Sequence, residues 1–429
     1  MSRALLLAAL APALARAASV ALNATTIPHL GWVQATFTLD KPGSADIFFT
    51  VHTPASANVS AIPPQPYPAE APWLAAAAQK WISCAAVPHC IGSRTFSYNF
   101  SLVNSYADAA IHAFAGGVAA PVHLAASPAI TFTSPSAPSR GHLARLPSPA
   151  AMNVTWWSPL VGVAGARVRW GAAPGALAAS APAQAATYAA ADLCGLPATG
   201  MGWQAPHFWL TATITGLAPG SAAPVYYSYG SDAGGWSAPL SFLPPPAPGA
   251  AGTTRMLLLA DNGVTEPDGC QDHWDEPDAS LTVQHLRELV ESGSGYDYSL
   301  IVHPGDVSYG TGMLAKWSTY TARWAGVFDR VPYLVGQGLW RQQAAAAAAA
   351  AAAAPYCTPY APTPSSPPLP CACMQPRARF SGKQHGPVPL FREQGQRRRV
   401  RRGHQHHLSR VCAVARAGAR RSDGAHAEL

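Results

Sequence analysis

The chain has 429 residues, enough for two or three domains, and only 11% of its residues are charged. Glycine (36) and proline (42) together contribute 78 residues, which favours loop-rich β structure over long charged helices. The net charge of +7 comes from residues 377–429, which hold 13 of the 28 lysines and arginines but only 3 of the 21 acidic residues. The rest of the chain therefore lacks the excess of basic residues that is typical of a nucleic-acid-binding protein.

Residues 1–17 have the pattern of a secretory signal peptide. Arg3 provides a positive charge, an apolar stretch runs from Ala4 to Ala15, and Ala15-Arg16-Ala17 is a small-x-small cleavage site. The stretch is shorter than the roughly 20 apolar residues that span a bilayer. The alternative is an N-terminal helix of the first domain. We therefore expect a secreted, extracellular protein, or a vacuolar one, without a membrane span after cleavage.

Sequons and cysteines point to the same compartment. Four N-x-S/T sequons predict a glycoprotein, at Asn23, Asn58, Asn99 and Asn153. Cys84 and Cys90 could close a short loop under oxidising conditions. Cys371-Ala-Cys373 lacks the two-residue spacing of a zinc knuckle, so we expect no metal site there.

Residues 18–140 and 141–250 are expected to form two β-sandwiches. In the first, the short alternating runs GWVQATFTL, ADIFFTV and RTFSYNFSLV predict strands. The stretch SPSAPSRGHLARLPSPA is interpreted as a linker. In the second, Leu210, Ala212 and Ile214 alternate along a strand, and an L-x-P-G corner leads to a strand with Tyr226 and Tyr227. That order resembles fibronectin type III-like sandwiches.

Residues 251–338 change to an α/β pattern. TTRMLLLADNG predicts a strand buried on both faces, and a helix follows that Asp278 and Ser280 can cap, with Leu281, Leu286, Leu289 and Val290 along one side. YSLIVHPGD is a second buried strand. A helical stripe then runs from Leu314 to Phe328, and VPYLV is a third strand. Strand, helix, strand, helix, strand predicts a parallel sheet with helical cover.

Three oxygen-bearing side chains stand just past the ends of these strands. Asp261 follows the first strand, and Asp306 follows the second, with Tyr309 three residues further on. Because ligands bind at the carboxyl edge of an open α/β sheet, the two carboxylates and the phenol can approach one point. Hard oxygen ligands of this kind suit a trivalent or hard divalent ion. The alternative is that Asp261 caps a helix and Asp306 closes a turn.

Several stretches resemble one family. LLLADNG and IVHPGDVSYGTG are similar to the first two metal motifs of calcineurin-like metallophosphoesterases, specifically purple acid phosphatases, which read D-x-G and G-D-x-x-Y. RTFSYNFSLVNSYADAAIHAFAGG, LCGLPATGMGW and GLAPGSAAPVYYSYG resemble the larger plant and algal members, which place two β-sandwiches before the catalytic domain. The resemblance covers residues 20–338.

The resemblance implies a binuclear metal centre and an acid phosphatase that hydrolyses phosphate monoesters, and diphosphate bonds as a further class. In the family Fe(III) is held by Asp, Tyr and His, a Zn, Mn or Fe(II) ion is held by Asn and two His, and an aspartate bridges the ions. On matching positions, Asp261 and Tyr309 would be iron ligands and Asp306 the bridge. No other catalytic residue is identified.

The chain departs from the family after residue 338. The third motif, G-N-H-E/D, is replaced by Gly338-Leu339-Trp340-Arg341, whose leucine and tryptophan cannot ligate a metal, and a fourth motif is not found. Gly403-His404-Gln405-His406 matches the fifth motif, G-H-x-H, but follows QRRRVRR instead of an apolar strand, so a solvated tail is preferred. The second metal site is therefore unsupported, the α/β domain is incomplete, and we expect little or no phosphatase activity.

Residues 339–429 are interpreted as a low-complexity, atypical basic tail. An alanine tract, a proline-rich stretch and clustered arginines follow one another. A reading-frame or splicing error in a G+C-rich gene would give such a run, and a degenerate enzyme is the alternative. The second functional hypothesis is a non-catalytic extracellular binding module built on the sandwiches. The expected partners are small phosphoester substrates, with neither nucleic acid nor membrane, and the chain could pair as a homodimer.

Overall fold

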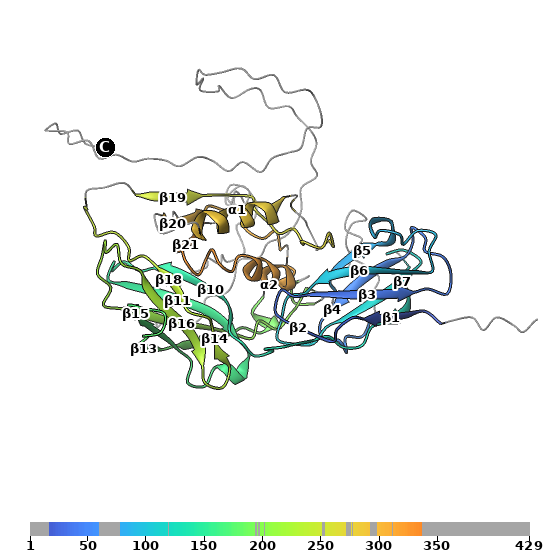
Figure 1. Ribbon diagram of the computed structural model, residues 1–429, viewed down its shortest axis with the longest axis horizontal. Coiled ribbons are helices and arrows are strands. Elements are labelled where there is room, and N and C mark those ends of the chain that lie inside the picture. Colours follow the sequence, from blue (N-terminus) through green and yellow to red (C-terminus); the bar gives the residue numbers. More distant parts are fainter. Residues whose placement is uncertain are drawn as a thin grey trace, which may run out of the picture.

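The computed structural model describes residues 17–336, except 60–77, 119, 194, 196–197, 201, 251–253, 272–275, 277, 292–297 and 311. Within these residues the chain forms two β-sandwiches and a third unit with a parallel sheet and two helices (Figure 1). The expected signal peptide, except for its last residue, and the tail 339–429 lie outside this part of the chain. No helix among the described residues is long and apolar enough to cross a membrane.

The first sandwich consists of two antiparallel sheets. One sheet has the order β1 (Ser19–Leu22), β3 (Trp32–Thr38), β6 (Thr95–Ser101). The other has the order β5 (Ala78–Ser83), β4 (Phe48–His52), β7 (Ala110–Ala115), β8 (Val122–Ala126). The short strands β2 (Thr26–Ile27) and β9 (Thr131–Phe132) pair in parallel, and a 3-10 turn, Cys84–Ala86, follows β5.

Alternation along the strands builds the core of the first sandwich. In β3, Val33, Ala35 and Phe37 are fully buried, whereas Trp32 on the same strand is 52% exposed. A strand places successive side chains on opposite faces, so this period-two pattern fixes which face packs inward. Cys84 and Cys90 are buried in the same core and form a disulfide, so the short loop considered from the sequence is closed.

The second sandwich repeats the same arrangement. One sheet has the order β10 (Ser139–Arg145), β11 (Ala151–Ser158), β15 (Phe208–Thr215), β14 (Gln184–Ala186). The other has the order β13 (Ala179–Pro182), β12 (Arg167–Gly171), β16 (Val225–Ser231), β17 (Gly235–Trp236), and β18 (Leu240–Phe242) also pairs with β16. Two 3-10 turns, Leu160–Gly162 and Ala190–Asp192, lie between strands. In each sandwich the first two long strands (β1 and β3, β10 and β11) share a sheet with a later strand (β6, β15), as in fibronectin-like folds.

The interpretation of residues 134–150 as a linker was wrong in part. Residues 139–145 form β10, which pairs with β11 along its length. Leu143 and Arg140 on this strand are fully or nearly buried, at 0% and 3% exposed. The strand was not predicted because proline and serine residues, which are typical of loops, flank it on both sides. The short run between them contains Gly141 and shows no clear alternation of apolar and polar residues.

The third unit confirms the predicted strand–helix order. Three strands pair in parallel in the order β19 (Arg255–Leu258), β20 (Tyr298–His303), β21 (Tyr333–Val335). Helix α1 (Ala279–Glu291) joins the first two strands, and α2 (Leu314–Arg323) precedes the third. Leu257 of β19 and Ile301 of β20 pack in one core with side chains of both helices, so the helices cover that face of the sheet.

The expectation that β19 is buried on both faces was wrong. Met256 and Leu258 are 42% and 50% exposed, and Leu334 of β21 is 54% exposed. In the register Leu258 lies beside Val302, which lies beside Leu334, so these residues share the face opposite the helices. No described element covers that face. Leu281 of α1 also differs from the expectation, because it is 59% exposed.

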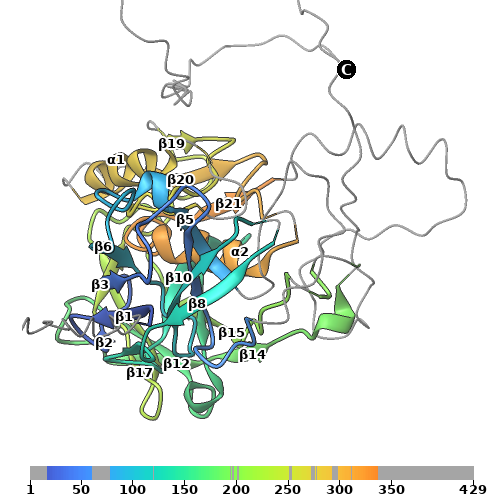
Figure 2. The same ribbon diagram turned by 90° about the vertical axis from the view of Figure 1, so that its right-hand side faces the viewer.

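The third unit packs against both sandwiches. The Leu143 N–H of β10 donates to the Phe328 carbonyl at 2.8 Å, and the Tyr227 hydroxyl donates to the Asp329 carbonyl. Arg140 lies where all three units meet: its guanidinium donates to the Ser318 carbonyl of α2 and to the Asn104 carbonyl of the first sandwich. Figure 2 shows α2 and β21 close to β10. The chain therefore forms one packed body around the third unit.

Candidate metal centre

The register of the parallel sheet places the predicted ligands beside one another. Leu258 at the end of β19 pairs with Val302 near the end of β20, so the loops that follow these strands leave the sheet at the same edge. Asp261 lies on the first loop, and Asp306 and Tyr309 lie on the second. The Gly263 N–H donates to the Val307 carbonyl at 3.0 Å and ties the two loops together.

Asp261 and Tyr309 are in direct contact. The Tyr309 hydroxyl donates to Asp261 Oδ1 at 2.7 Å, although the two residues are 48 positions apart. Asp306 is half-buried on the loop that carries Tyr309, and Asp261 is exposed to solvent. The structure thus brings two of the three predicted ligands together and places the third on the adjoining loop. An ion or anionic ligand can reach this edge from solution.

All three candidate ligands have left-handed backbone conformations. Their φ angles are 54° at Asp261, 51° at Asp306 and 50° at Tyr309. Such values are uncommon for residues other than glycine and cost free energy, and they concentrate at functional sites. Gly263 is also left-handed, with φ 59°, and a Cβ there would lie 2.5 Å from Glu276 Cγ. The two loops therefore hold a strained, closely packed arrangement that points the ligands at one edge.

The electrostatics keep the Tyr309 phenol protonated when no cation is bound. Burial, the hydrogen bond to Asp261, and the charges of Asp261, Asp306 and Glu276 all raise the pKa of Tyr309 above its ordinary value of 10.0. A hard cation would reverse this balance, because a phenolate and carboxylates are the oxygen donors such ions prefer. The donor chemistry therefore fits one hard metal ion.

The described residues do not fit a second metal ion. No group of three or more His, Cys, Asp or Glu side chains among them is arranged to hold a metal. The replaced third motif, Gly338–Arg341, and the sequence match at His404 and His406 lie outside the described residues. Of the metal ligands predicted from the sequence motifs, Asp261, Asp306 and Tyr309 lie in the part of the chain that the structure describes.

Two residues near the site were not singled out from the sequence. Asn262 is 4% exposed, and its side-chain amide donates to the Gly263 carbonyl at 3.0 Å, which stiffens the turn after Asp261. Glu276 packs over Gly263, and its charge acts on Tyr309. Asn262 was visible as the x of D-x-G. Glu276 belongs to no motif and reaches the site only through the folding of the chain before α1.

The sequons occupy different environments. Asn23, Asn58 and Asn99 are exposed, whereas Asn153 is half-buried in β11, a central strand. The Thr213 hydroxyl donates to Asn153 Oδ1 at 2.7 Å. Three of the four predicted glycosylation sites are therefore accessible in the folded protein.

Comparison with known families supports the resemblance found in the sequence. Residues 16–134 match the family described as the Fn3-like domain from purple acid phosphatase, and residues 138–243 match the purple acid phosphatase N-terminal domain. The first match covers the first sandwich and the second covers the second. From the sequence the fibronectin likeness was expected on the second sandwich, whereas the family with the Fn3-like description matches the first.

Individual relatives agree. "Probable inactive purple acid phosphatase 24" of Arabidopsis thaliana is 29% identical over 315 residues, 72% of this chain and 50% of that protein. A Hordeum vulgare "Nucleotide pyrophosphatase/phosphodiesterase" is 32% identical over 24% of this chain and 27% of its own. The structure of purple acid phosphatase PPD1 from yellow lupin (Lupinus luteus) superposes with a TM-score of 0.67 at 26% identity, covering 75% of this chain and 57% of that chain.

This chain spans about half the length of the Arabidopsis relatives that it matches. Both sandwiches match domains of one family in the expected order, and the lupin structure extends the likeness to most of the described chain. The chain belongs to the purple acid phosphatase family.

Proposed function

We propose that the chain is a secreted relative of acid phosphatases that binds one hard metal ion through Asp261, Tyr309 and Asp306 and has little or no turnover in its present form. The observation that carries the proposal is the 2.7 Å contact between Tyr309 and Asp261 at the carboxyl edge of the sheet. Hydrolysis of phosphate monoesters is the reaction class that the family name supports for a complete centre. The Arabidopsis relatives named "probable inactive" favour low activity.

The residues of this chain supply binding and orientation. A bound pair of metal ions would contribute Lewis-acid neutralisation of the phosphate charge. Asp261 holds the Tyr309 hydroxyl next to a carboxylate oxygen, so the proton that must leave before the phenol can bind a cation sits between two ligands. The exposed position of Asp261 keeps this edge open to a phosphoester. Among the described residues, no group of three or more His, Cys, Asp or Glu side chains is arranged to hold a metal ion.

Iron titration tests the proposal. The full chain is titrated with Fe(III), the visible absorption band of an iron(III) tyrosinate is recorded, and turnover of a phosphate monoester is measured alongside. We expect one band that saturates at about one iron per chain, with no turnover above background. Tyr309→Phe abolishes the band. Tyr298→Phe, which changes a half-buried tyrosine at the start of β20, leaves the band unchanged.

Two results would contradict the proposal. A band that persists in Tyr309→Phe means that another tyrosine binds iron. Turnover that disappears in Asp306→Ala means that the chain is a working phosphatase and that its second metal ligands come from residues outside the described part.

A surface feature favours a second candidate, an extracellular binding module. An open hollow of about 320 Å³ on the second sandwich is lined by Arg169, Leu177, Ser228, Trp236 and nearby prolines. The Arg169 guanidinium lies 3.6 Å from the centre of the Trp236 ring. Arginine and aromatic side chains are enriched in protein interfaces. Under this alternative the chain purifies without stoichiometric iron and never develops the band.

A further inference from the structure

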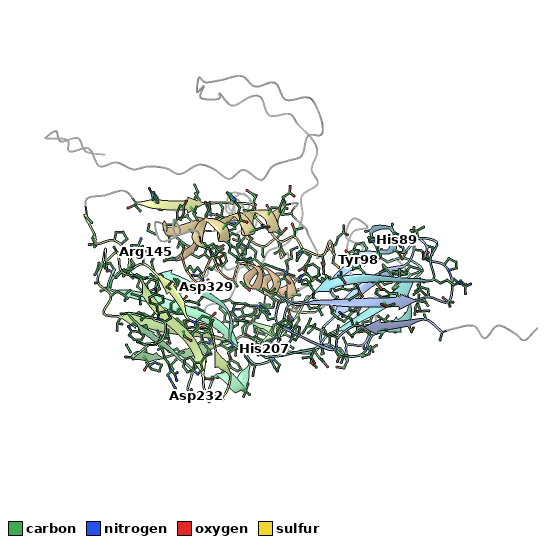
Figure 3. The ribbon with its side chains drawn as sticks, in the orientation of Figure 1. His89, Tyr98, Arg145, His207, Asp232 and Asp329 are labelled. Carbon is green, nitrogen blue, oxygen red and sulfur yellow. A yellow bond between two sulfur atoms is a disulfide. The ribbon has the colours of Figure 1, made fainter. Side chains whose placement is uncertain are left out.

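The loop that follows Asp261 joins the first sandwich. Trp81 of β5 and Gln271 of this loop donate backbone hydrogen bonds to each other, at 2.9 and 2.7 Å. The loop therefore forms an antiparallel bridge with the edge strand of a sheet in the first sandwich. The Tyr98 hydroxyl of β6 donates to the Asp268 carbonyl, and Figure 3 shows Tyr98 on the side of the first sandwich that faces the third unit. Cys270 is buried in the core of the first sandwich.

A buried network of four charges fastens this loop. Lys80 Nζ of β5 lies 3.1 Å from Glu266 Oε2 and 2.5 Å from Asp268 Oδ2, and it also donates to the Ser101 carbonyl. Arg323 at the end of α2 contacts Glu266 Oε2 at 2.7 Å. The side chains of Lys80, Glu266 and Asp268 are at most 4% exposed, and that of Arg323 is 16% exposed. Two positive and two negative charges from three segments therefore balance in the interior.

The opposite charges around Lys80 and Glu266 keep these two side chains ionised. Burial alone would lower the pKa of Lys80, but the charges of Glu266 and Asp268 offset burial, and its pKa is raised above 10.5. Burial would raise the pKa of Glu266, but Lys80 and Arg323 outweigh it, and its pKa is lowered. Removing one member of such a group leaves an uncompensated buried charge, which is strongly destabilising. Loss of any one member is therefore expected to weaken the docking of the loop.

The network connects to both ligand loops. Glu266 stands five residues after Asp261, and between them Gly263 donates its N–H to the Val307 carbonyl, next to Asp306. Arg323 is at the end of α2, the helix that follows the Tyr309 loop. A shift of the loop away from the first sandwich would pull at the Gly263–Val307 hydrogen bond, because few residues separate that bond from the docked segment.

We propose that Lys80 is a positioning residue for the metal site and that the first sandwich is part of the support of that site instead of an appended module. Lys80 acts through Glu266 and Asp268, which fix the loop that carries Asp261 against the Tyr309 loop. The inference deepens the proposed function and rests on it, because the positioned side chains are the candidate ligands.

Hydrogen exchange of single backbone amides tests the proposal without any metal. In the full chain, Lys80→Met is compared with Lys41→Met, an exposed lysine of the same sandwich, and with Phe37→Leu, which weakens the core of that sandwich and leaves all four network charges in place. We expect the amides of Gln271 and Gly263 to exchange roughly 10-fold to 100-fold faster in Lys80→Met than in the wild type. Both controls leave the Gly263 amide within about 2-fold of the wild type after correction for global stability.

A milder variant and an iron titration complete the experiment. Glu266→Gln removes one buried charge without shortening the side chain, and it is read in the same way if Lys80→Met does not fold. Fe(III) affinity of the variants, followed by the tyrosinate band, is expected to fall about 10-fold or more in Lys80→Met and to stay unchanged in Lys41→Met.

The outcomes separate this inference from the proposed function. Faster exchange at Gln271 with an unchanged Gly263 amide overturns the positioning role, because the loop then loosens without disturbing the ligand loops. Equal acceleration of Gly263 in Phe37→Leu also overturns it, since any weakening of the sandwich would then suffice. A wild type that binds no iron refutes the metal site, while the Gly263 amide still decides whether Lys80 positions Asp261.

Discussion

Three histidines meet on one face of the first sandwich, and we predict that two of them, His52 and His112, make this domain less stable in acid. His52 of β4, His112 of β7 and His123 of β8 come from adjacent strands. The ring centres of His52 and His112 are 4.9 Å apart, and His112 Nδ1 lies 3.1 Å from His123 Nε2. Burial, followed by the charges of the neighbouring histidines, lowers the pKa of His52 from 6.5 to about 3 and that of His112 to about 4.

The sign and size of the effect follow from proton binding. Above pH 6.5 the His52 imidazole is neutral in the folded and the unfolded chain, so it contributes no pH dependence. Below pH 6.5 the His52 side chain binds a proton in the unfolded chain, whereas in the folded chain it stays neutral down to about pH 3. Acid therefore favours unfolding between pH 6.5 and about pH 3. At pH 4.5 the loss from His52 alone amounts to roughly 3 kcal/mol, and His112 adds to it with the same sign.

The assay is urea unfolding at pH 7.5 and pH 4.5, followed by tryptophan fluorescence, for which the half-buried Trp81 of β5 is a reporter in this sandwich. In His52→Phe the stability lost between the two pH values should be smaller than in the wild type by roughly 3 kcal/mol. His285→Phe replaces a histidine of α1 whose side chain is 66% exposed, and it should keep the wild-type pH dependence. Equal losses in wild type and His52→Phe would refute the reasoning, because His52 would then bind its proton equally in both states.

Three further predictions follow from the packing. Arg140→Leu removes a buried guanidinium that is hydrogen-bonded to all three units and should cost about 3 kcal/mol or more in urea unfolding, whereas Arg145→Leu, on the exposed end of the same strand, should cost about 0.5 kcal/mol or less. Replacing both Cys84 and Cys90 by serine opens a short loop and should cost about 2 kcal/mol in the same assay. Peptide mass spectrometry of the exported protein should find a glycan on exposed Asn99 and none on Asn153, and a glycan on Asn153 would show that this strand is accessible before the sandwich closes.

The fold was largely predictable where one periodicity dominates a segment. The alternation of Leu210, Ala212 and Ile214 predicted β15, and the three residues are fully or nearly buried. The apolar runs of the third unit predicted parallel strands, yet they did not reveal that the described elements leave one sheet face uncovered, because a continuous apolar run looks the same whether one or both faces are covered. Strand β10 was missed because its buried residues include Arg140, a charged side chain that only tertiary hydrogen bonds to other units make tolerable away from water.

The candidate ligands were predictable because motif spacing determines their place at strand ends. Asp261 and Tyr309 lie 48 residues apart in sequence and touch through the parallel register. The left-handed backbone at both residues was not predictable, because neither is a glycine and no local signal favours such a conformation there. The strain is sustained by contacts around the loops, such as Glu276 packed over Gly263, which no motif contains.

The docking of the Asp261 loop is the part of the site that sequence patterns could not reach. Lys80 and Asp268 are 188 residues apart and belong to different domains, so no spacing rule connects them. A single lysine on a strand is ordinarily exposed to solvent. Acidic residues that follow a metal motif predict a solvent-exposed loop. These side chains are desolvated only when the two domains pack, and Lys80 and Glu266 then stay ionised because of the opposite charges beside them. The ligands therefore come from short motifs, whereas the rigidity that keeps them in place comes from charges contributed by separate domains.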